Sequence, residues 1–199
     1  MIFDLHVHTI HSPCSALRLD EILREARSRG LDGVAVTDHN CMDIRHEIVE
    51  GVQDNDFCLL VGMEYDTPDG DFLLFGPFED LKPGLTAREL LRLVDERQGV
   101  AIGAHPCREG RSLSTHILEL SDCRIIEGLN GRNSDAENRG VEQLTKKYPL
   151  FQCGGSDAHS LDELGRTATC FEDRITNRND LIAALKSGRY HPVRNTHLP

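Results

Sequence analysis

Short hydrophobic runs along this chain of 199 residues end, one after another, in histidines and carboxylates. The runs alternate with segments whose apolar residues recur at helical spacing, which predicts a mostly parallel sheet with helices packed on it. Parallel strands bring their carboxyl ends to one edge, so polar residues that lie far apart in the sequence would meet there. The polar clusters are His6-Val7-His8, Asp38-His39, Glu64, His105-Pro106 and Asp157-Ala158-His159.

The periodicity and the residues that start and stop helices place the expected elements. We expect strands over residues 2–8, 33–37, 57–63, 72–75, 100–104, 124–129, 150–153 and 167–171. Helices are expected over residues 19–29, more weakly 42–52, and 86–97, 134–147 and 179–187. Thr86 and Ser134 each open a capping-box sequence, and Asp69-Gly70 is a turn at which residues 72–75 pair back as a hairpin. Seven or so strands in a single domain over residues 1–199 predict a small or incomplete barrel.

The composition narrows the classes of function. A net charge of −11 opposes broad electrostatic attraction to nucleic acid, so stable binding of duplex nucleic acid is not expected. Seven cysteines without a framework of close spacings indicate free thiols in a reducing compartment. No signal-peptide pattern is visible, and no apolar run approaches the roughly 18 residues that span a membrane. We therefore expect a cytoplasmic protein without membrane contact.

The polar residues at the strand ends have the chemistry of metal ligands. Asp4, His6 and His8 alternate along the first expected strand, so their side chains should share one face, which is the inner face in a barrel. Imidazole and carboxylate ligands together suit zinc, iron or manganese. Asp4 and Asp38 are better placed to orient imidazoles from behind than to bind metal themselves.

These segments resemble, in order, the four motifs of the PHP (polymerase and histidinol phosphatase) family. The resemblance runs from residue 2 to about residue 193 and rests on Asp4-Leu-His-Val-His-Thr9, Val36-Thr-Asp-His39, Gly62-Met-Glu64, Ala104-His-Pro106 and Gly155-Ser-Asp-Ala-His159. Two further stretches, Ile126-Glu-Gly-Leu-Asn-Gly-Arg132 and Glu163-Leu-Gly-Arg166, are similar to small stand-alone members. The resemblance implies an α/β fold, a distorted (β/α)7 barrel, with a trinuclear metal site that hydrolyses phosphoesters at the C-terminal strand ends. We expect two or three divalent transition-metal ions (Zn, Mn or Fe) in this chain.

The resemblance also implies a role for each ligand. The first ion would be held by His6, His8, Glu64 and Asp157. Glu64 would bridge to a second ion, which His105 would also bind, and His39 and His159 would hold the third. A metal-activated hydroxide would attack phosphorus. His39 or His159 would stabilise the leaving group if it were not fully committed to metal.

Two positions depart from the commoner family pattern. Asp71 stands where many relatives have His, and Cys14 stands where relatives have Asp or His. Both residue types can bind metal, so Asp71 would make the second site richer in oxygen and Cys14 would make the third site softer. Each also has a structural interpretation, as a solvated turn residue for Asp71 and a small buried hydrophobe for Cys14.

Three functions remain open. The leading one is a metal-dependent phosphatase or phosphodiesterase that acts on a small phosphorylated metabolite, a nucleotide or a short oligonucleotide. Arg108 and Arg132, which follow expected strand-end motifs, could clamp the substrate phosphate, although an exposed arginine is usually only solvated. The alternative is an amidohydrolase-type deacylase, because that superfamily also combines His-X-His with further His and Asp on a barrel. The third is a non-catalytic metal-binding module.

Replacing Asp71→His is expected to shift the metal preference toward zinc. The substitution exchanges an anionic oxygen ligand for an imidazole, which suits zinc better than it suits a harder ion such as Mn²⁺. Elemental analysis of wild-type and variant protein, each purified without added metal, measures the change. An identical metal content in both proteins would favour the structural interpretation of Asp71 as a solvated turn residue.

Overall fold

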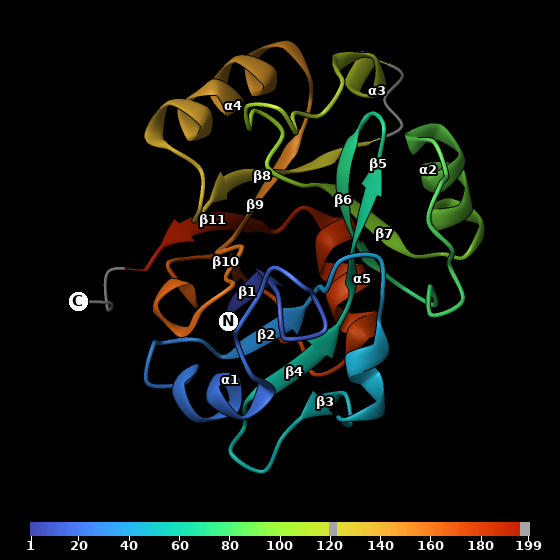
Figure 1. Ribbon diagram of the computed structural model, residues 1–199. Coiled ribbons are helices and arrows are strands. Elements are labelled where there is room, and N and C mark those ends of the chain that lie inside the picture. Colours follow the sequence, from blue (N-terminus) through green and yellow to red (C-terminus); the bar gives the residue numbers. More distant parts are fainter. Residues whose placement is uncertain (120–122, 196–199) are drawn as a thin grey trace.

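The computed structural model describes residues 1–119 and 123–195, which form a mixed α/β fold (Figure 1). One sheet contains β1 (Ile2–Val7), β2 (Gly33–Val36), β3 (Gly51–Val52), β4 (Cys58–Val61), β10 (Thr167–Phe171) and β11 (Tyr190–Arg194). The other contains β5 (Met63–Thr67), β6 (Gly70–Phe75), β7 (Val100–Gly103), β8 (Ile125–Asn130) and β9 (Phe151–Gly155). The helices are α1 (Leu19–Glu25), α2 (Ala87–Glu96), α3 (Thr115–Glu119), α4 (Asp135–Lys147) and α5 (Arg178–Ser187), with short 3-10 helices η1 (Asp43–His46) and η2 (Leu161–Glu163).

The described strands form two sheets and no closed barrel, so the predicted (β/α)7 barrel is not confirmed. The strand orders are β11-β10-β1-β2-β4-β3 and β5-β6-β7-β8-β9. The pairs β1–β2, β2–β4, β7–β8 and β8–β9 are parallel, as predicted. However, β10 is antiparallel to β1, and β6 is antiparallel to both of its neighbours. Isolated bridges, Val7 to Ala158 and His39 to Glu64, link residues at the ends of the two sheets.

Two local features explain where the barrel pattern breaks. The tight connection at Pro68-Asp69 returns β6 antiparallel to β5, because a parallel return needs a long crossover. Gly62 separates β4 from β5, so the single strand expected over residues 57–63 is two strands. A Cβ at Gly62 would lie 2.5 Å from a ring carbon of Phe75, so only glycine allows this close approach.

Most other elements agree with the sequence. Both predicted capping boxes are present, at Thr86 and Ser134. The helix predicted over residues 42–52 is wrong, because this segment forms η1 and then β3, which pairs antiparallel with β4. Neither α3 nor β11 was predicted. Pro192 within β11 argues against a strand, but β11 lies at the edge of its sheet, where proline is tolerated.

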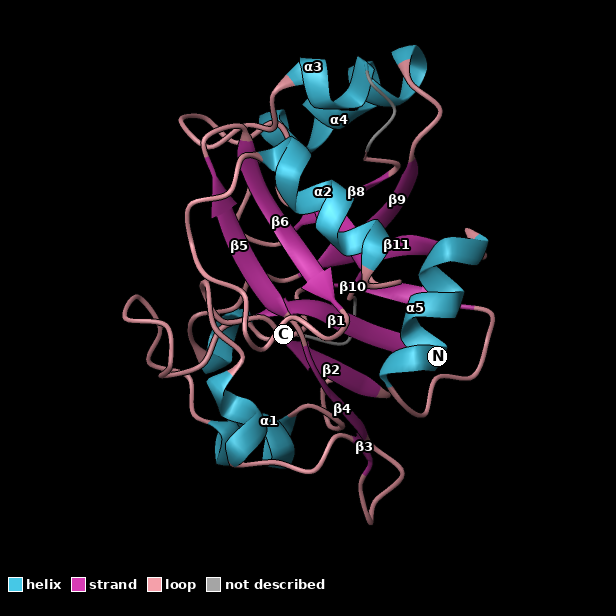
Figure 2. Cartoon of the chain, turned by 90° about the vertical axis from the view of Figure 1, so that its right-hand side faces the viewer, coloured by secondary structure: helices cyan, strands magenta, loops and turns pink. Residues whose placement is uncertain are grey.

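Two hydrophobic clusters fill the fold. One draws residues from both sheets and from α5, and its members Phe3, Phe75 and Leu185 are fully buried. The other packs the remaining helices onto the sheets, for example through Ile22 of α1 and Leu90 of α2. Figure 2 shows α2 and α5 on the same side of the molecule, where both contact β7. None of the helices in the described ranges is long and apolar enough to cross a membrane.

The register between β1 and β2 is interrupted at the start of the candidate site. Two residues of β1, Leu5 and His6, stand opposite the single residue Ala35 of β2. Such a bulge turns a side chain away from the direction that strict alternation would give it. The Asp4 carboxylate accepts from the backbone N–H groups of His6, Ser156 and Gly165. The imidazole rings of His6 and His8 instead face Glu64 and Asp157. The prediction that these three side chains share one face is therefore wrong for Asp4.

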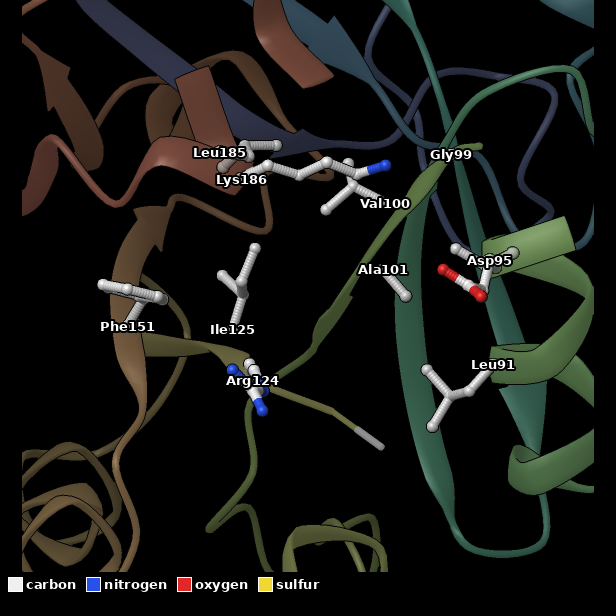
Figure 3. A pocket seen from close by; sticks show the side chains of 11 residues that line it. Leu91, Asp95, Gly99, Val100, Ala101, Arg124, Ile125, Phe151, Leu185 and Lys186 are labelled. Carbon is white, nitrogen blue, oxygen red and sulfur yellow. The ribbon is translucent and has the colours of Figure 1, made fainter. Parts of the chain in front are cut away.

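A pocket of about 310 Å³ lies at the amino ends of β7 and β8, between α2 and α5 (Figure 3). Apolar side chains such as Val100 and Ile125 line it, together with the charged Asp95, Arg124 and Lys186. None of the candidate metal ligands is among its described lining residues. The candidate ligands gather at the opposite edge of the sheet. Those that follow the carboxyl ends of β1, β2, β7 and β9 are His8, His39, His105 and Asp157, and the hairpin of β5 and β6 adds Glu64 and Asp71.

Candidate metal centre

Four buried side chains form what we call the first ligand group: His6, His8, Glu64 and Asp157. The Nε2 atoms of His6 and His8 are 3.0 Å apart. Glu64 Oε2 lies 3.3 Å and 3.2 Å from these nitrogens, and Asp157 Oδ1 lies 3.6 Å and 3.4 Å from them. Tetrahedral ligands about 2.0–2.2 Å from an ion are about 3.3–3.6 Å from one another. The spacing of these atoms therefore fits one divalent ion.

The second carboxylate oxygen of Glu64 faces another set of ligands, the second ligand group, which consists of Glu64, Asp71 and His105. Glu64 Oε1 lies 2.9 Å from His105 Nε2, and Asp71 Oδ2 lies 3.7 Å from that nitrogen. Because each oxygen of Glu64 belongs to a different group, this carboxylate has the geometry of a bridge. Asp71, whose ligand role was open in the sequence, thus lies inside the cluster.

The third ligand group consists of His8, His39 and His159. The ring of His8 lies between the other two, with centroid distances of 4.5 Å to His39 and 4.3 Å to His159. His39 Nδ1 is buried 3.1 Å from Glu64 Oε2 and has no hydrogen-bond partner among the described residues. A buried nitrogen in this state calls for an explanation, and metal coordination would provide one. The three groups together suit divalent metal ions.

Glu64 is ionised in this environment. Burial alone would raise the pKa of Glu64, but the imidazoles of His6, His105 and His8 outweigh burial and lower the pKa well below its usual value. Burial likewise opposes ionisation of Asp157, whose pKa is nevertheless lowered by its neighbouring histidines and Arg108. Both groups are carboxylates at neutral pH, which is the form that binds metal.

Glu127 of β8 contacts two candidate ligands, His6 and His105, on the side away from the cluster. It was not among the residues predicted from the sequence. Its Oε1 is 2.9 Å from His6 Nδ1, and its Oε2 accepts the backbone N–H of His105 at 2.8 Å. A proton on Nδ1 leaves His6 Nε2 free to face the first ligand group. The available signal in the sequence was a carboxylate directly after Ile125 and Ile126 in an expected strand. The structure buries this carboxylate, since Glu127 is 1% exposed.

A family model described as the PHP domain matches residues 4–123, and one described as PHP-associated matches residues 135–190. The chain belongs to the PHP family. The first match contains the ligand candidates from His6 to His105, and the second contains Asp157 and His159. Both halves of this PHP chain therefore contribute to the candidate metal centre.

Several solved structures share the fold of this PHP chain. PsfC of Pseudomonas syringae PB-5123 has a TM-score of 0.77 and 19% identity, and the match covers 100% of this chain and 93% of that one. A two-domain protein of Bacteroides vulgatus, described as containing a predicted PHP-like metal-dependent phosphoesterase, has a TM-score of 0.72 and 18% identity over 98% of this chain and 65% of that one. The lesion-specific endonuclease Q of Pyrococcus furiosus has a TM-score of 0.71 and 20% identity, covering 96% and 57%. Identities this low show similarity of fold alone.

Asp4 and Asp38, the two aspartates that were expected to orient imidazole rings, differ in their contacts. Asp4 accepts hydrogen bonds from the backbone N–H groups of Ser156 and Gly165, and burial raises its pKa to about 6. Asp4 therefore fixes the loops after β9 rather than an imidazole ring. Asp38 accepts a hydrogen bond from Ser12 Oγ, which in turn lies 3.3 Å from His8 Nδ1. Asp38 thus supports His8 through one intervening hydroxyl group.

Cys14 lies outside the cluster. Its side chain is exposed, and it belongs to none of the three ligand groups found among the described residues. Partial burial raises the pKa of the Cys14 thiol, which disfavours the thiolate needed for metal binding. The structure does not bring Cys14 to the third ligand group, because the loop after β1 directs it to solvent.

The two arginines expected to bind substrate, Arg108 and Arg132, differ in their contacts with other residues of the chain. Arg108 Nη2 donates to Asp157 Oδ2 at 2.7 Å and to Asn130 Oδ1 at 2.8 Å. Arg132 lies 3.5 Å from a carboxylate oxygen of Glu163, and its side chain is 41% exposed. Arg108 is therefore tied to a candidate metal ligand, whereas Arg132 is exposed and makes a longer ionic contact.

Arg111 is a further residue of the candidate metal centre that was not predicted from the sequence. Its Nε donates to Asp71 Oδ2 at 2.8 Å, and its Nη2 lies 3.1 Å from Asp66 Oδ1. The guanidinium thus offsets the charge that Asp71 brings beside Glu64 and holds the Asp71 carboxylate against His105. No short motif marks Arg111, so only the tertiary structure reveals this contact.

Replacing Glu127→Gln should weaken metal binding about 10- to 100-fold, which is the usual effect of removing the group that orients a ligand. The neutral amide of the variant is a weaker acceptor for the Nδ1–H of His6 than the ionised carboxylate. Titration of chelator-treated protein with zinc or manganese measures the affinity. Glu142→Gln on the exposed face of α4 is the control, and equal affinities in both variants would contradict the role of Glu127.

Replacing Cys14→Ala should leave the metal stoichiometry unchanged, because this exposed thiol lies outside the ligand groups. Elemental analysis of the purified variant measures the number of ions per chain. The loss of one ion would show that Cys14 is a ligand after all.

Proposed function

We propose that this PHP protein is a metal-dependent phosphoesterase, a phosphatase or phosphodiesterase that acts on a small phosphorylated metabolite, a nucleotide or a short oligonucleotide. The observation that carries the proposal is the bridging geometry of Glu64, whose two oxygens face two separate ligand groups. Neighbouring ions are the usual means of stabilising both the attacking and the leaving oxygen in phosphoryl transfer. Metal-dependent hydrolysis is also the chemistry named for the structurally similar Bacteroides protein.

The residues of the three groups would hold two or three ions. When bound, such ions lower the pKa of coordinated water and neutralise charge on phosphoryl oxygens. Asp71 gives the second ligand group two carboxylates and one imidazole, so we propose Mn²⁺ or Fe²⁺ there rather than zinc. The first and third groups contain more imidazole and are compatible with zinc, iron or manganese.

His159 and His39 differ in how well each could donate a proton to a leaving group. His159 Nδ1 donates to the backbone carbonyl of Asp157 at 2.8 Å, so its Nε2 is an acceptor and suits metal binding. The side chain of His39 is 19% exposed, and its Nδ1 lies 3.6 Å from Asp66. We propose that Glu64 is catalytic through the ions that it positions. His39 would be the better candidate of the two to protonate a leaving group if it were not committed to the third ion.

The substrate is proposed to be small. Arg132 is the exposed cation best placed to contact a phosphate, while Arg108 positions Asp157. Endonuclease Q acts on DNA and shares this fold, so duplex DNA is a class to test. However, the matched region covers 57% of the Pyrococcus endonuclease chain, and the net charge of −11 opposes the approach of a polyanionic duplex.

Replacing Glu64→Gln should remove metal from two ligand groups together and reduce turnover by at least about a hundredfold, since metal stabilisation of the transition state is worth several kcal/mol. The measurements are elemental analysis without added metal and phosphate release from sugar phosphates, histidinol phosphate, nucleotides and oligonucleotides. Glu96→Gln on the surface of α2 is the matched control.

Each outcome of this screen is informative. Full metal content and activity in Glu64→Gln protein would exclude the bridge. Turnover of amides but no phosphoesters by the wild-type protein would favour the amidohydrolase-type deacylase. Bound metal without any turnover would favour the non-catalytic module.

A further inference from the structure

A second polar cavity, of about 540 Å³, lies beside the loop that joins β8 to α4. Its lining includes Arg29, Arg166 and Arg194, against the single acidic residue Asp162. None of the described residues that line it belongs to the three ligand groups. In a chain with a net charge of −11, three arginines around one cavity form a local positive site.

The three guanidinium groups retain donors for a ligand. Arg29 Nη1 donates to the Leu164 carbonyl at 3.3 Å, and Arg166 Nε donates to the Asp162 carbonyl at 3.1 Å. Arg194 pairs with the exposed Asp135 at 2.9 Å. A guanidinium has five N–H donors, so each arginine can donate further. Arg29 Nε has no hydrogen-bond partner among the described residues, so the hydrogen bond from this guanidinium group to Leu164 uses Nη1.

The chemistry of the cavity matches a phosphate group. Arginine binds phosphate through paired, charge-assisted hydrogen bonds, and the neighbouring Asn133 and Thr167 add neutral polar groups. The volume lies within the range of small-molecule sites, so the cavity can hold more than a single ion. Few apolar side chains line it, which disfavours a lipid.

We propose that this cavity is an anion site that binds the phosphate group of a small molecule independently of the metal centre. Asn130 links the two sites, because it lines the cavity while its side chain contacts Asp157 Oδ2 at 3.4 Å and accepts from Arg108. An occupant of the cavity therefore touches a residue that supports a candidate metal ligand. Coupling between the two sites would be reciprocal.

The test is calorimetric titration of the full chain with inorganic phosphate, and with AMP as a second probe. Metal-loaded wild-type protein is compared with chelator-treated wild-type protein and with chelator-treated Glu64→Gln protein. In both chelator-treated proteins phosphate cannot bind through the metal centre. We expect saturable phosphate binding in all three proteins. Binding of AMP at least tenfold tighter than that of phosphate would identify a nucleotide as the source of the group, and equal affinity would identify free phosphate.

The arginines are tested one at a time in the chelator-treated protein. Arg29→Gln and Arg166→Gln should each weaken phosphate binding at least about tenfold, as expected for loss of charge-assisted hydrogen bonds. Arg166→Lys, which keeps the charge, should recover part of the affinity. Arg92→Gln, on the exposed face of α2, is the control. Thermal melting verifies that each variant is folded.

Two results would overturn the proposal. One is the absence of saturable phosphate binding once the metal centre is removed. The other is an affinity within twofold of wild type in both folded glutamine variants. Neither result bears on the phosphoesterase proposal, which rests on metal content and turnover in Glu64→Gln protein.

Discussion

The buried carboxylate of Glu64 is the group on which the rest of the site depends. Its oxygens lie 2.9 Å from His105, 3.1 Å from His39, and 3.2 Å and 3.3 Å from His8 and His6. A buried charge is strongly unfavourable unless it is paired, so Glu64 can be buried only where these histidines converge. The histidines come from segments far apart in the sequence, which makes the fold and the site inseparable.

The site also lies where the two sheets come together. The isolated bridges pair His39 with Glu64 and Val7 with Ala158, so each includes or adjoins candidate ligands. Gly155, at the end of β9, permits this approach, because a Cβ there would lie 2.5 Å from the His6 Cβ. Ions held across this junction would add to the backbone hydrogen bonds that already join these segments, such as those of His8 with Ala158 and of Asn40 with Glu64. Metal binding is therefore expected to contribute to stability as well as to chemistry.

Buried polar residues make the ligand positions rigid. Asp4 fastens the loops after β9, Glu127 orients His6, and Asp38 acts on His8 through Ser12. These contacts orient side chains of the first ligand group and the loop that carries Asp157. Arg111 holds the carboxylate of Asp71, and Arg108 holds that of Asp157. Because both guanidinium groups are paired with these carboxylates, they contribute less positive charge that could attract a large polyanion.

The sequence by itself determined the alternation of strands and helices, the capped helices α2 and α4, and the ligand candidates at the strand ends, because periodicity and short motifs are local properties. It also identified the PHP family, which the family models confirm. Only the tertiary structure decided that the strands form two sheets, because strand direction depends on pairing between distant segments. The same holds for individual contacts. The register in β1 is interrupted, and the Asp4 carboxylate contacts backbone N–H groups rather than an imidazole. Glu127 and Arg111 join the site, and Cys14 faces solvent, since long-range packing sets each of these positions.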